Sequence, residues 1–284
     1  MRLLAAALAP VALATFLLFA AAGSAMAQSQ PVRLYDLGRS LAAYHPAAAG
    51  TERRQFIPVD PAAPYPEADG EPADVRVSYT GRFVRGSRGF FSGDLHFWDH
   101  TGTHVDAPRH YVPEGAEPER QRSIGELELS QLHGPLVIID TSGRADRNVT
   151  AQDIDRVRAR LVGGAWLLAN LGHAGQFGAS GYNADTAPGF TLEACERLSQ
   201  LIDAGEAEIA GIGADNGGVD RIPNFQSIQR SCHGLLLPRN IPLIENLGDL
   251  SAVSADPGAC ELIVAPMKVV GASGAPARVF ARCE

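Results

Sequence analysis

The chain has 284 residues, with 24 basic and 32 acidic side chains and a formal charge of −8 at pH 7. This length suits one large domain or two small ones, and no stretch of the sequence resembles a linker between domains. Because the chain is acidic and has no block of basic residues, its composition argues against nucleic acid and against an anionic membrane surface as partners.

The first 27 residues are typical of a secretory signal peptide. Arg2 precedes an apolar run over residues 3–22, and Ala25-Met26-Ala27 has the small-residue pattern that signal peptidase recognises. The alternative is a membrane anchor, because about 20 apolar residues can span a bilayer. The cleavage pattern favours removal of the signal. We therefore expect an exported protein, periplasmic or secreted, with a single mature domain over residues 28–284 and no membrane association after cleavage.

Four cysteines are available for disulfides in the oxidising compartment that an exported chain meets. They allow three pairings, and the sequence does not choose among them. Pairing of Cys260 with Cys283, which flank the last predicted strands, is one of the open alternatives. The absence of a C-x-x-C spacing disfavours a thiolate metal site. The four cysteines are Cys195, Cys232, Cys260 and Cys283.

The amino-terminal part of the mature chain shows little periodicity. Residues 32–37 predict an initial strand. Residues 42–74 contain six prolines and predict an irregular excursion, which is either a binding loop or a surface wrap. Residues 75–80 alternate and predict a strand, whereas the glycine-rich residues 82–93 predict a turn.

Strands and helices alternate in the second half of the chain, which is typical of the α/β class. Thr150 and Asp153 resemble a capping box that opens a helix ending at Leu161. Thr191 opens a second helix that ends at Gly205, and residues 231–237 predict a short third one. Strands are predicted over residues 136–140, 165–170, 207–212, 241–245 and 260–265, with edge-like strands over residues 269–271 and 277–281.

Residues 100–110 hold three of the eight histidines of the chain and one aspartate. Imidazole and carboxylate groups are ligands that suit zinc, manganese or iron, so this density predicts a metal site. The alternative, that these histidines only satisfy hydrogen bonds in the core, is usual for one histidine and disfavoured for such a cluster. The cluster comprises His100, His104, Asp106 and His110.

An extended conformation fits this segment better than a helix, because Gly102 and Pro108 are poor helix formers. In a strand, His104 and Asp106 share one face. Gly102 lets the chain fold His100 back toward that face. We assign His110, just beyond Pro108, to proton transfer, because its pKa suits that task at neutral pH. The alternative role for His110 is that of a fourth ligand.

The pattern H-x-G-T-H-x-D-x-P-x-H is complete at residues 100–110. It resembles the signature of the cyclase family of metal-dependent hydrolases, which includes bacterial kynurenine formamidases and isatin hydrolases. His233 and Glu245, twelve residues apart, are similar to the second pair of metal ligands in the kynurenine formamidases. The resemblance covers about residues 90–284, with a weaker echo at residues 34–37.

The resemblance implies a set of roles for these side chains. His100, His104 and Asp106 would hold a first divalent metal, zinc or manganese. Asp106 would bridge to a second ion, completed by His233 and Glu245, and the number of ions, one or two, stays open. The resemblance also implies a single α/β domain of the swivelling β/β/α type, with a mixed β-sheet core and flanking helices, and a homodimer or a larger homo-oligomer.

Two departures from the family pattern concern the substrate. Asp36-Leu37-Gly38 stands where the family has Asp-Leu-Ser, and the aromatic wall that a Pro-Trp segment supplies in kynurenine formamidases has Pro64-Tyr65-Pro66 as its nearest counterpart. Export adds a further reason to expect a different substrate, because tryptophan catabolism is cytosolic work. The substrate could then be an amide, a lactam or a lactone.

The leading hypothesis is hydrolysis of a non-peptide carbon–nitrogen bond in a small amide, such as an arylformamide or a cyclic amide. The metal would activate water, and His110 would pass a proton to the departing nitrogen. One alternative is a non-haem iron oxygenase, in which His104, Asp106 and a distant histidine form a two-histidine, one-carboxylate site. Another is an exported metal or solute binder without catalytic activity.

Overall fold

In the computed structural model, residues Val32–Glu284 form a single compact unit. The predicted signal peptide, the proline-rich residues 42–74 and the Pro64-Tyr65-Pro66 segment lie outside the residues that the structure describes. Within the described part of the chain, no helix is both long and apolar enough to cross a bilayer. The described residues are 31–39, 77–83, 91–112, 116–117, 121–176, 183, 186–221, 228–256 and 258–284.

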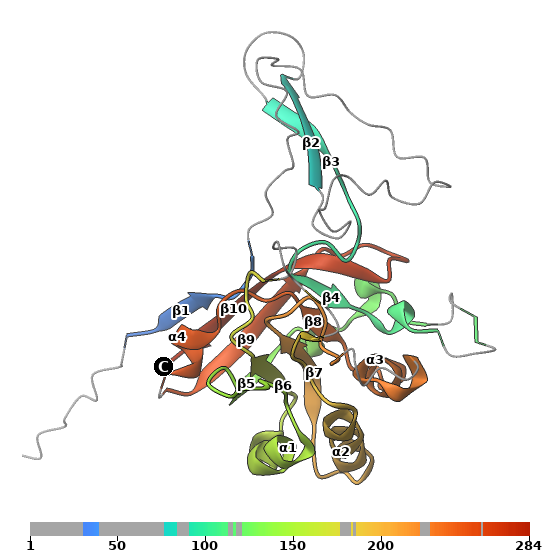
Figure 1. Cartoon of the computed structure of the whole chain (residues 1–284). Coiled ribbons are helices and arrows are strands. Elements are labelled where there is room, and N and C mark those ends of the chain that lie inside the picture. The colour runs from blue at the N-terminus through green and yellow to red at the C-terminus, as the bar shows by residue number, and fades with distance from the viewer. Residues whose placement is uncertain are drawn as a thin grey trace, which may run out of the picture. The chain divides into compact units, whose positions relative to one another are not determined.

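The central sheet closes into a seven-stranded barrel in the order β10-β4-β8-β7-β6-β5-β9, because β9 also pairs with β10 (Figure 1). β1 pairs with β10 outside this ring. The strands from β5 to β8 are parallel and the other pairings are antiparallel, which confirms the predicted mixed sheet. The strands of this sheet are β1 (Arg33–Asp36), β4 (His104–Asp106), β5 (His133–Asp140), β6 (Ala165–Asn170), β7 (Ile209–Ala214), β8 (Leu243–Glu245), β9 (Cys260–Pro266) and β10 (Gly274–Cys283).

Two further strands form a separate antiparallel hairpin, and short helices connect the strands of the barrel. The hairpin consists of β2 (Val77–Phe83) and β3 (Phe91–Phe97). The α-helices are α1 (Ala151–Val157), α2 (Leu192–Asp203), α3 (Cys232–Leu236) and α4 (Ser251–Ser254). The described 3-10 helices are η2 (Pro108–His110), η4 (Ile124–Glu126), η5 (Leu129–Gln131), η6 (Arg158–Arg160), η9 (Ile228–Arg230) and η10 (Leu237–Arg239).

Side-chain alternation divides the core in two. Along β6, Trp166 and Leu168 join a cluster to which all seven barrel strands contribute, and that cluster therefore fills the barrel. Leu167 and Ala169 join a second cluster, which includes buried residues of α1 and α2 and lies between the barrel and the helices. All four of these side chains are fully buried. Because β6 is buried on both faces, its sequence is one nearly continuous apolar run.

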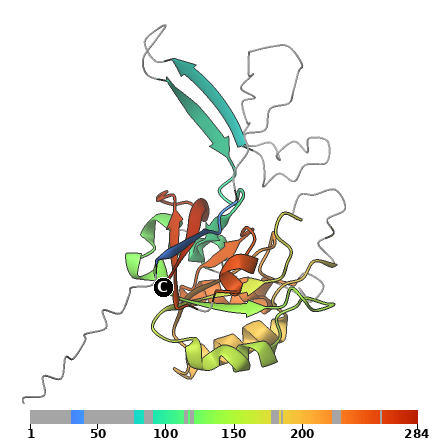
Figure 2. The same cartoon turned by 90° about the vertical axis from the view of Figure 1, so that its left-hand side faces the viewer.

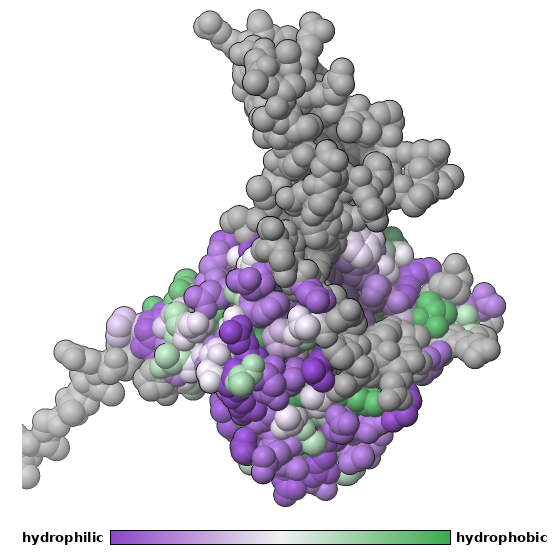
Figure 3. Space-filling model, in the orientation of Figure 1, coloured by the Kyte–Doolittle hydropathy of each residue, from purple (hydrophilic) through white to green (hydrophobic). Residues whose placement is uncertain are grey.

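Helices α1 and α2 lie side by side against one face of the barrel (Figures 1 and 2). The predicted capping box is confirmed, because Asp153 accepts hydrogen bonds from both the amide and the hydroxyl of Thr150. Leu198 of α2 is fully buried, which stabilises the fold by roughly 1.5–3 kcal/mol. The outer surface over these helices is mostly hydrophilic, as Figure 3 shows.

The structure corrects three expectations. Residues 82–93 are not one turn, because β2 continues to Phe83 and β3 begins at Phe91. Residues 269–271 are not a strand: Gly271 has a φ of +83° and ends a turn. β10 is not an edge strand, because it pairs with β1, β4 and β9. The pairings of β10 with β1 and β4 join distant parts of the chain, so local sequence patterns carry little information about them.

Candidate metal centre

Neighbouring strands β4 and β8 place three of the predicted ligands on one face of the barrel wall. In their antiparallel register, His104 lies opposite Glu245. Val105 and Ile244 point into the barrel core. Because side chains alternate along a strand, His104, Asp106 and Glu245 point to the opposite face. The predicted extended conformation of residues 104–106 is therefore confirmed.

Helix α3 brings His233 to the same face. The helix begins after Ser231, whose hydroxyl accepts a hydrogen bond from the Gly234 amide. The Nε2 atom of His233 lies 3.4 Å from Asp106 Oδ2 and 3.3 Å from Glu245 Oε1. The structure thus brings the downstream pair, His233 and Glu245, together with the upstream histidine–aspartate motif.

A hydrogen bond to the backbone fixes the orientation of the His104 ring. Its Nδ1 lies 2.8 Å from the carbonyl oxygen of Gly102, so Nδ1 carries the proton and donates it. The φ of Gly102 is +65°, a conformation that favours glycine, as the sequence predicted. The other nitrogen, Nε2, then faces two carboxylates, at 3.2 Å from Asp106 Oδ1 and 3.5 Å from Glu245 Oε2. This arrangement is common for histidines that bind metals.

The chemistry of these donors fits a divalent cation. His104, Asp106 and Glu245 are all buried. His104 Nε2 and Asp106 Oδ2 are nevertheless among the buried side-chain atoms without a hydrogen-bond partner within the described residues. Each such atom costs about 1–3 kcal/mol. A cation between them would satisfy both lone pairs, and nitrogen and oxygen ligands of this kind suit zinc or manganese.

The electrostatics of the cluster also favour a cation. Burial alone would lower the pKa of His104, but the charges of Asp106 and Glu245 outweigh it and raise that pKa to about 10. Burial likewise opposes the charge of His233, yet the nearby carboxylates of Asp106, Asp220 and Glu245 raise its pKa well above the usual value. The buried carboxylates thus favour positive charge beside them. A divalent cation would supply that charge and leave both imidazoles neutral, as metal ligands must be.

His100 joins the cluster through Asp106. Its Nδ1 lies 2.6 Å from Asp106 Oδ1, and its Nε2 lies 3.0 Å from the hydroxyl of Ser273. That hydroxyl donates a 2.7 Å hydrogen bond to Asp99. Both ring nitrogens of His100 therefore have partners, unlike those of His104. The ring packs against Gly274, where an added Cβ would lie 2.8 Å from His100 Cε1.

His110 lies at the exposed side of the cluster. It ends the 3-10 helix η2, which Pro108 begins. Its ring centroid is 4.0 Å from that of His100 and 5.7 Å from that of His233. Partial burial of the ring lowers the pKa of His110 below its usual value and outweighs the opposing effect of the Asp106 carboxylate. A neutral imidazole at this place can accept a proton at neutral pH.

Several residues near the cluster escaped the sequence analysis. The carboxylate of Asp220 lies 2.5 Å from Nδ1 of His233, and the hydroxyl of Ser273 lies 3.0 Å from Nε2 of His100. Trp98 is 40% exposed, and its ring centroid lies 5.0 Å from that of His100. Asp220 lies in an isolated β-bridge and Ser273 in a bend, both far along the chain from the histidine motif, and no spacing pattern connects them to it. Trp98 is only two residues from His100, so its proximity could have been anticipated.

The family model Cyclase, described as "Putative cyclase", matches residues 35–221, which is more than half of the chain. The chain belongs to the cyclase family. The resemblance predicted from residues 100–110 is thereby confirmed. The matched segment ends before His233 and Glu245, whose proximity to the motif is observed in the structure alone.

Curated relatives of this cyclase-family chain are named kynurenine formamidases. The one from Salinibacter ruber is 27% identical over 210 residues, which cover 74% of this chain and 88% of the relative. The one from Sphingopyxis alaskensis is 31% identical over 183 residues, which cover 64% of this chain and 76% of the relative. These names support the prediction that the chain is an enzyme, a metal-dependent hydrolase.

Solved structures share the fold. Isatin hydrolase A from Labrenzia aggregata, bound to benzyl benzoate, has a TM-score of 0.63 and 25% identity, covering 89% of this chain and 94% of its own. An isatin hydrolase bound to the product analogue thioisatinate has a TM-score of 0.64 and 23% identity, covering 88% of this chain and 92% of its own. The cyclase-family barrel with flanking helices is therefore the fold of both, and it agrees with the predicted α/β class.

Proposed function

We propose that this cyclase-family hydrolase cleaves a non-peptide carbon–nitrogen bond of a small amide, with arylformamides and cyclic amides as the substrate classes. The observation that carries the proposal is the convergence of His104, Asp106, His233 and Glu245 around two buried atoms that lack hydrogen-bond partners. The relatives named kynurenine formamidase and isatin hydrolase support the amide class.

We assign the binding of zinc or manganese to His100, His104, Asp106, His233 and Glu245. When bound, such a cation supplies Lewis acidity toward a carbonyl oxygen and lowers the pKa of a water molecule to about 7. Asp106 approaches His104 through Oδ1 and His233 through Oδ2, so its two oxygens can serve two ions. The proposal therefore includes one or two ions per chain.

His110 is the proposed proton carrier. Its imidazole is exposed on one side and contacts His100 on the other, which places it between solvent and the buried donors. Burial lowers its pKa, which favours the neutral ring, and a neutral ring can take up the proton that water releases and pass it to the departing nitrogen. A step of this kind is worth roughly 10²–10⁴-fold in rate.

Trp98 is the proposed contact for the ring of an aryl substrate. Its side chain is partly exposed, and its ring is tilted by 47° to the ring of His100, with the two centroids 5.0 Å apart. Aromatic pairs contribute about 0.5–1.5 kcal/mol beyond the area they bury. In this proposal, Trp98 takes the place that a Pro-Trp segment has in the kynurenine formamidases.

We also propose that the protein is exported after loss of residues 1–27 and acts as a single domain, residues 28–284, in the periplasm or outside the cell. Two disulfides, Cys195–Cys232 and Cys260–Cys283, support an oxidising compartment. A homodimer or larger homo-oligomer is part of the same proposal. Fractionation of the host cell and light scattering of the purified protein test these two points.

The central experiment combines elemental analysis of the mature protein with spectrophotometric assays on N-formylkynurenine and isatin. We expect zinc or manganese in the protein and chelator-sensitive turnover of an arylformamide or a cyclic amide without consumption of oxygen. Ferrous-dependent oxygen uptake would instead identify an oxygenase. A metal-loaded protein that turns over no amide, lactam or lactone would be a binder, and the proposal would be wrong.

A further inference from the structure

His233 stands on a helix that is too short to be stable alone. α3 comprises five residues, Cys232–Leu236, whereas isolated helices shorter than about 12–15 residues are marginal in water. A metal ligand must be held to within about 0.5 Å of its productive position. The rigidity of this ligand therefore depends on what anchors α3 to the rest of the fold.

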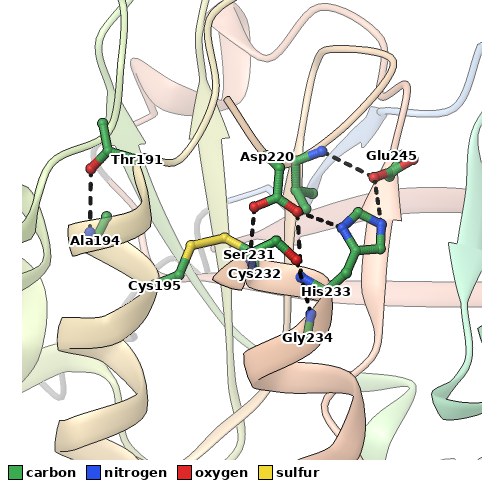
Figure 4. The surroundings of a disulfide bond; sticks show 10 residues. Thr191, Ala194, Cys195, Asp220, Ser231, Cys232, His233, Gly234 and Glu245 are labelled. Atoms are coloured by element: carbon green, nitrogen blue, oxygen red, sulfur yellow. Dashed lines mark hydrogen bonds and ion pairs between the residues drawn. A yellow bond between two sulfur atoms is a disulfide. The ribbon is translucent and has the colours of Figure 1, made fainter. Parts of the chain in front are cut away.

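Asp220 is the first anchor. Its Oδ1 accepts a 2.6 Å hydrogen bond from the amide of Cys232, and its Oδ2 lies 2.5 Å from Nδ1 of His233 (Figure 4). The preceding amide, that of Val219, donates to Glu245 Oε1 at 3.0 Å. One turn of the chain thus orients two of the proposed ligands. With Nδ1 occupied by Asp220, the Nε2 atom of His233 faces Asp106 and Glu245.

A disulfide is the second anchor. Cys232, the residue directly before His233, is bonded to Cys195 of α2 (Figure 4). α2 has twelve residues and packs its buried face against the barrel, so it is a firmer support than α3. Both cysteines are fully buried. The disulfide therefore joins the short helix that carries the ligand to a long helix that is itself fixed by the core.

We propose that the Cys195–Cys232 disulfide is a positioning element of the metal centre, which holds α3 against α2 so that Asp220 keeps His233 aimed at Asp106 and Glu245. The proposal rests on the proposed function only in taking His233 as a ligand. The disulfide is not a redox switch, because its buried sulfurs are shielded from attacking thiolates. Nor do Cys195, Asp220 and Cys232 form a second metal site, because the sulfurs are bonded to each other.

The second disulfide provides a matched control. Cys260 and Cys283 lie opposite each other on β9 and β10, and Cys260 contacts the Gly258 carbonyl rather than any residue of the metal centre. The sequence separations are 23 residues for this pair and 37 for Cys195–Cys232. Because loop-closure entropy grows only slowly with loop length, removing either bond destabilises the fold to a similar extent. A difference at the metal centre is then specific to the position of the disulfide.

The test compares Cys195→Ala/Cys232→Ala with Cys260→Ala/Cys283→Ala. Zinc affinity is measured by chelator competition, and hydrogen exchange of residues 231–237 is measured in the metal-free protein. For Cys195→Ala/Cys232→Ala we expect zinc affinity to fall about 10- to 100-fold, as for loss of other groups that orient metal ligands. We also expect faster exchange in α3. For Cys260→Ala/Cys283→Ala we expect both quantities to stay within about twofold of wild type.

Asp220→Asn is the second variant, because it keeps the disulfide and replaces one of the two carboxylate oxygens that hold Cys232 and His233. We expect it to lower zinc affinity by a similar factor without faster exchange in α2. The proposal would be overturned if Cys195→Ala/Cys232→Ala kept the zinc affinity and the hydrogen exchange of the wild type. It would also be overturned if Cys260→Ala/Cys283→Ala lost as much zinc affinity as Cys195→Ala/Cys232→Ala. If the wild type bound no zinc, the proposed function would fail, and exchange in the metal-free protein would still decide whether the disulfide positions α3.

Discussion

Substitution of Gly274 by alanine tests how tightly His100 is held. Gly274 begins β10 and pairs with Asp106 of β4. An added Cβ would lie 2.8 Å from His100 Cε1 and 2.8 Å from the carbonyl oxygen of Val105, whereas ordinary contacts begin at 3.4 Å. The imidazole and the strand must therefore separate by roughly 0.6 Å. The backbone of β4 cannot yield without disturbing its pairing with β8, so the ring of His100 has to move.

The cost follows from this overlap. Overpacking of a tight site costs about 1–3 kcal/mol. The reduced freedom of the unfolded chain after a glycine-to-alanine change offsets about 0.4–1 kcal/mol of that. The net loss is therefore about 1–2 kcal/mol, which lowers the melting temperature of a domain of this size by about 2–8 °C. Because the ring must leave its 2.6 Å contact with Asp106, we also expect zinc affinity to fall about tenfold.

The assay is thermal unfolding followed by circular dichroism, with zinc affinity measured by chelator competition. Gly218→Ala is the matched control, because its added Cβ would lie 3.8 Å from Glu245 Oε1, an ordinary contact beside the same site. We expect this control to unfold at or above the wild-type temperature and to bind zinc normally. If Gly274→Ala matched wild type in both measurements, His100 would not be held by β10, and the reasoning from close packing would be refuted.

Four further predictions concern the site and the fold. His110→Ala should keep its metal and lose hydrolysis by roughly 10²–10⁴-fold, whereas Asp106→Ala should lose both, as metal analysis and turnover will show. Trp98→Ala should raise KM for an arylformamide more than it lowers kcat. Removal of the metal by a chelator should abolish turnover and lower the melting temperature, and added zinc or manganese should restore both. Hydrogen bonds from Arg144 lower the pKa of Asp153, so the stability that this carboxylate contributes is present above its unfolded pKa and is lost in acid. The loss of about 1–2 kcal/mol in Asp153→Asn should thus shrink from pH 7 toward pH 3 in urea titrations.

Local patterns predicted the elements that local forces determine. The capping box formed by Thr150 and Asp153 is present as predicted. It gives hydrogen-bond partners to backbone amides at the start of a helix and needs only residues close in sequence. β6 was predicted with the correct bounds, because a short apolar run with a tryptophan suits a strand buried on both faces. The same reasoning placed His104 and Asp106 on one strand face, since alternation along a strand needs no information from the rest of the fold.

The contacts that complete the site depend on pairings that no local pattern encodes. Ser273 reaches His100 only because the start of β10 pairs with β4, and β10 was predicted as an edge strand. Asp220 reaches His233 from a segment that pairs with Phe190 in an isolated β-bridge, which local patterns do not predict. The pairing of His233 with Glu245 came from the family resemblance, and the structure places their side-chain atoms 3.3 Å apart.

Closure of the barrel by β10 has a consequence for the order in which the site can form. Gly274–Cys283 follows every proposed ligand in the chain, yet it is the partner of β4, which carries His104 and Asp106. A chain that ends at residue 273 should therefore bind no zinc, although it retains every proposed ligand. Synthesis is vectorial, so the cluster remains open until residues 274–283 have docked. The ion that the protein acquires is then chosen by the surroundings in which β10 docks, rather than by those in which the ligands are synthesised.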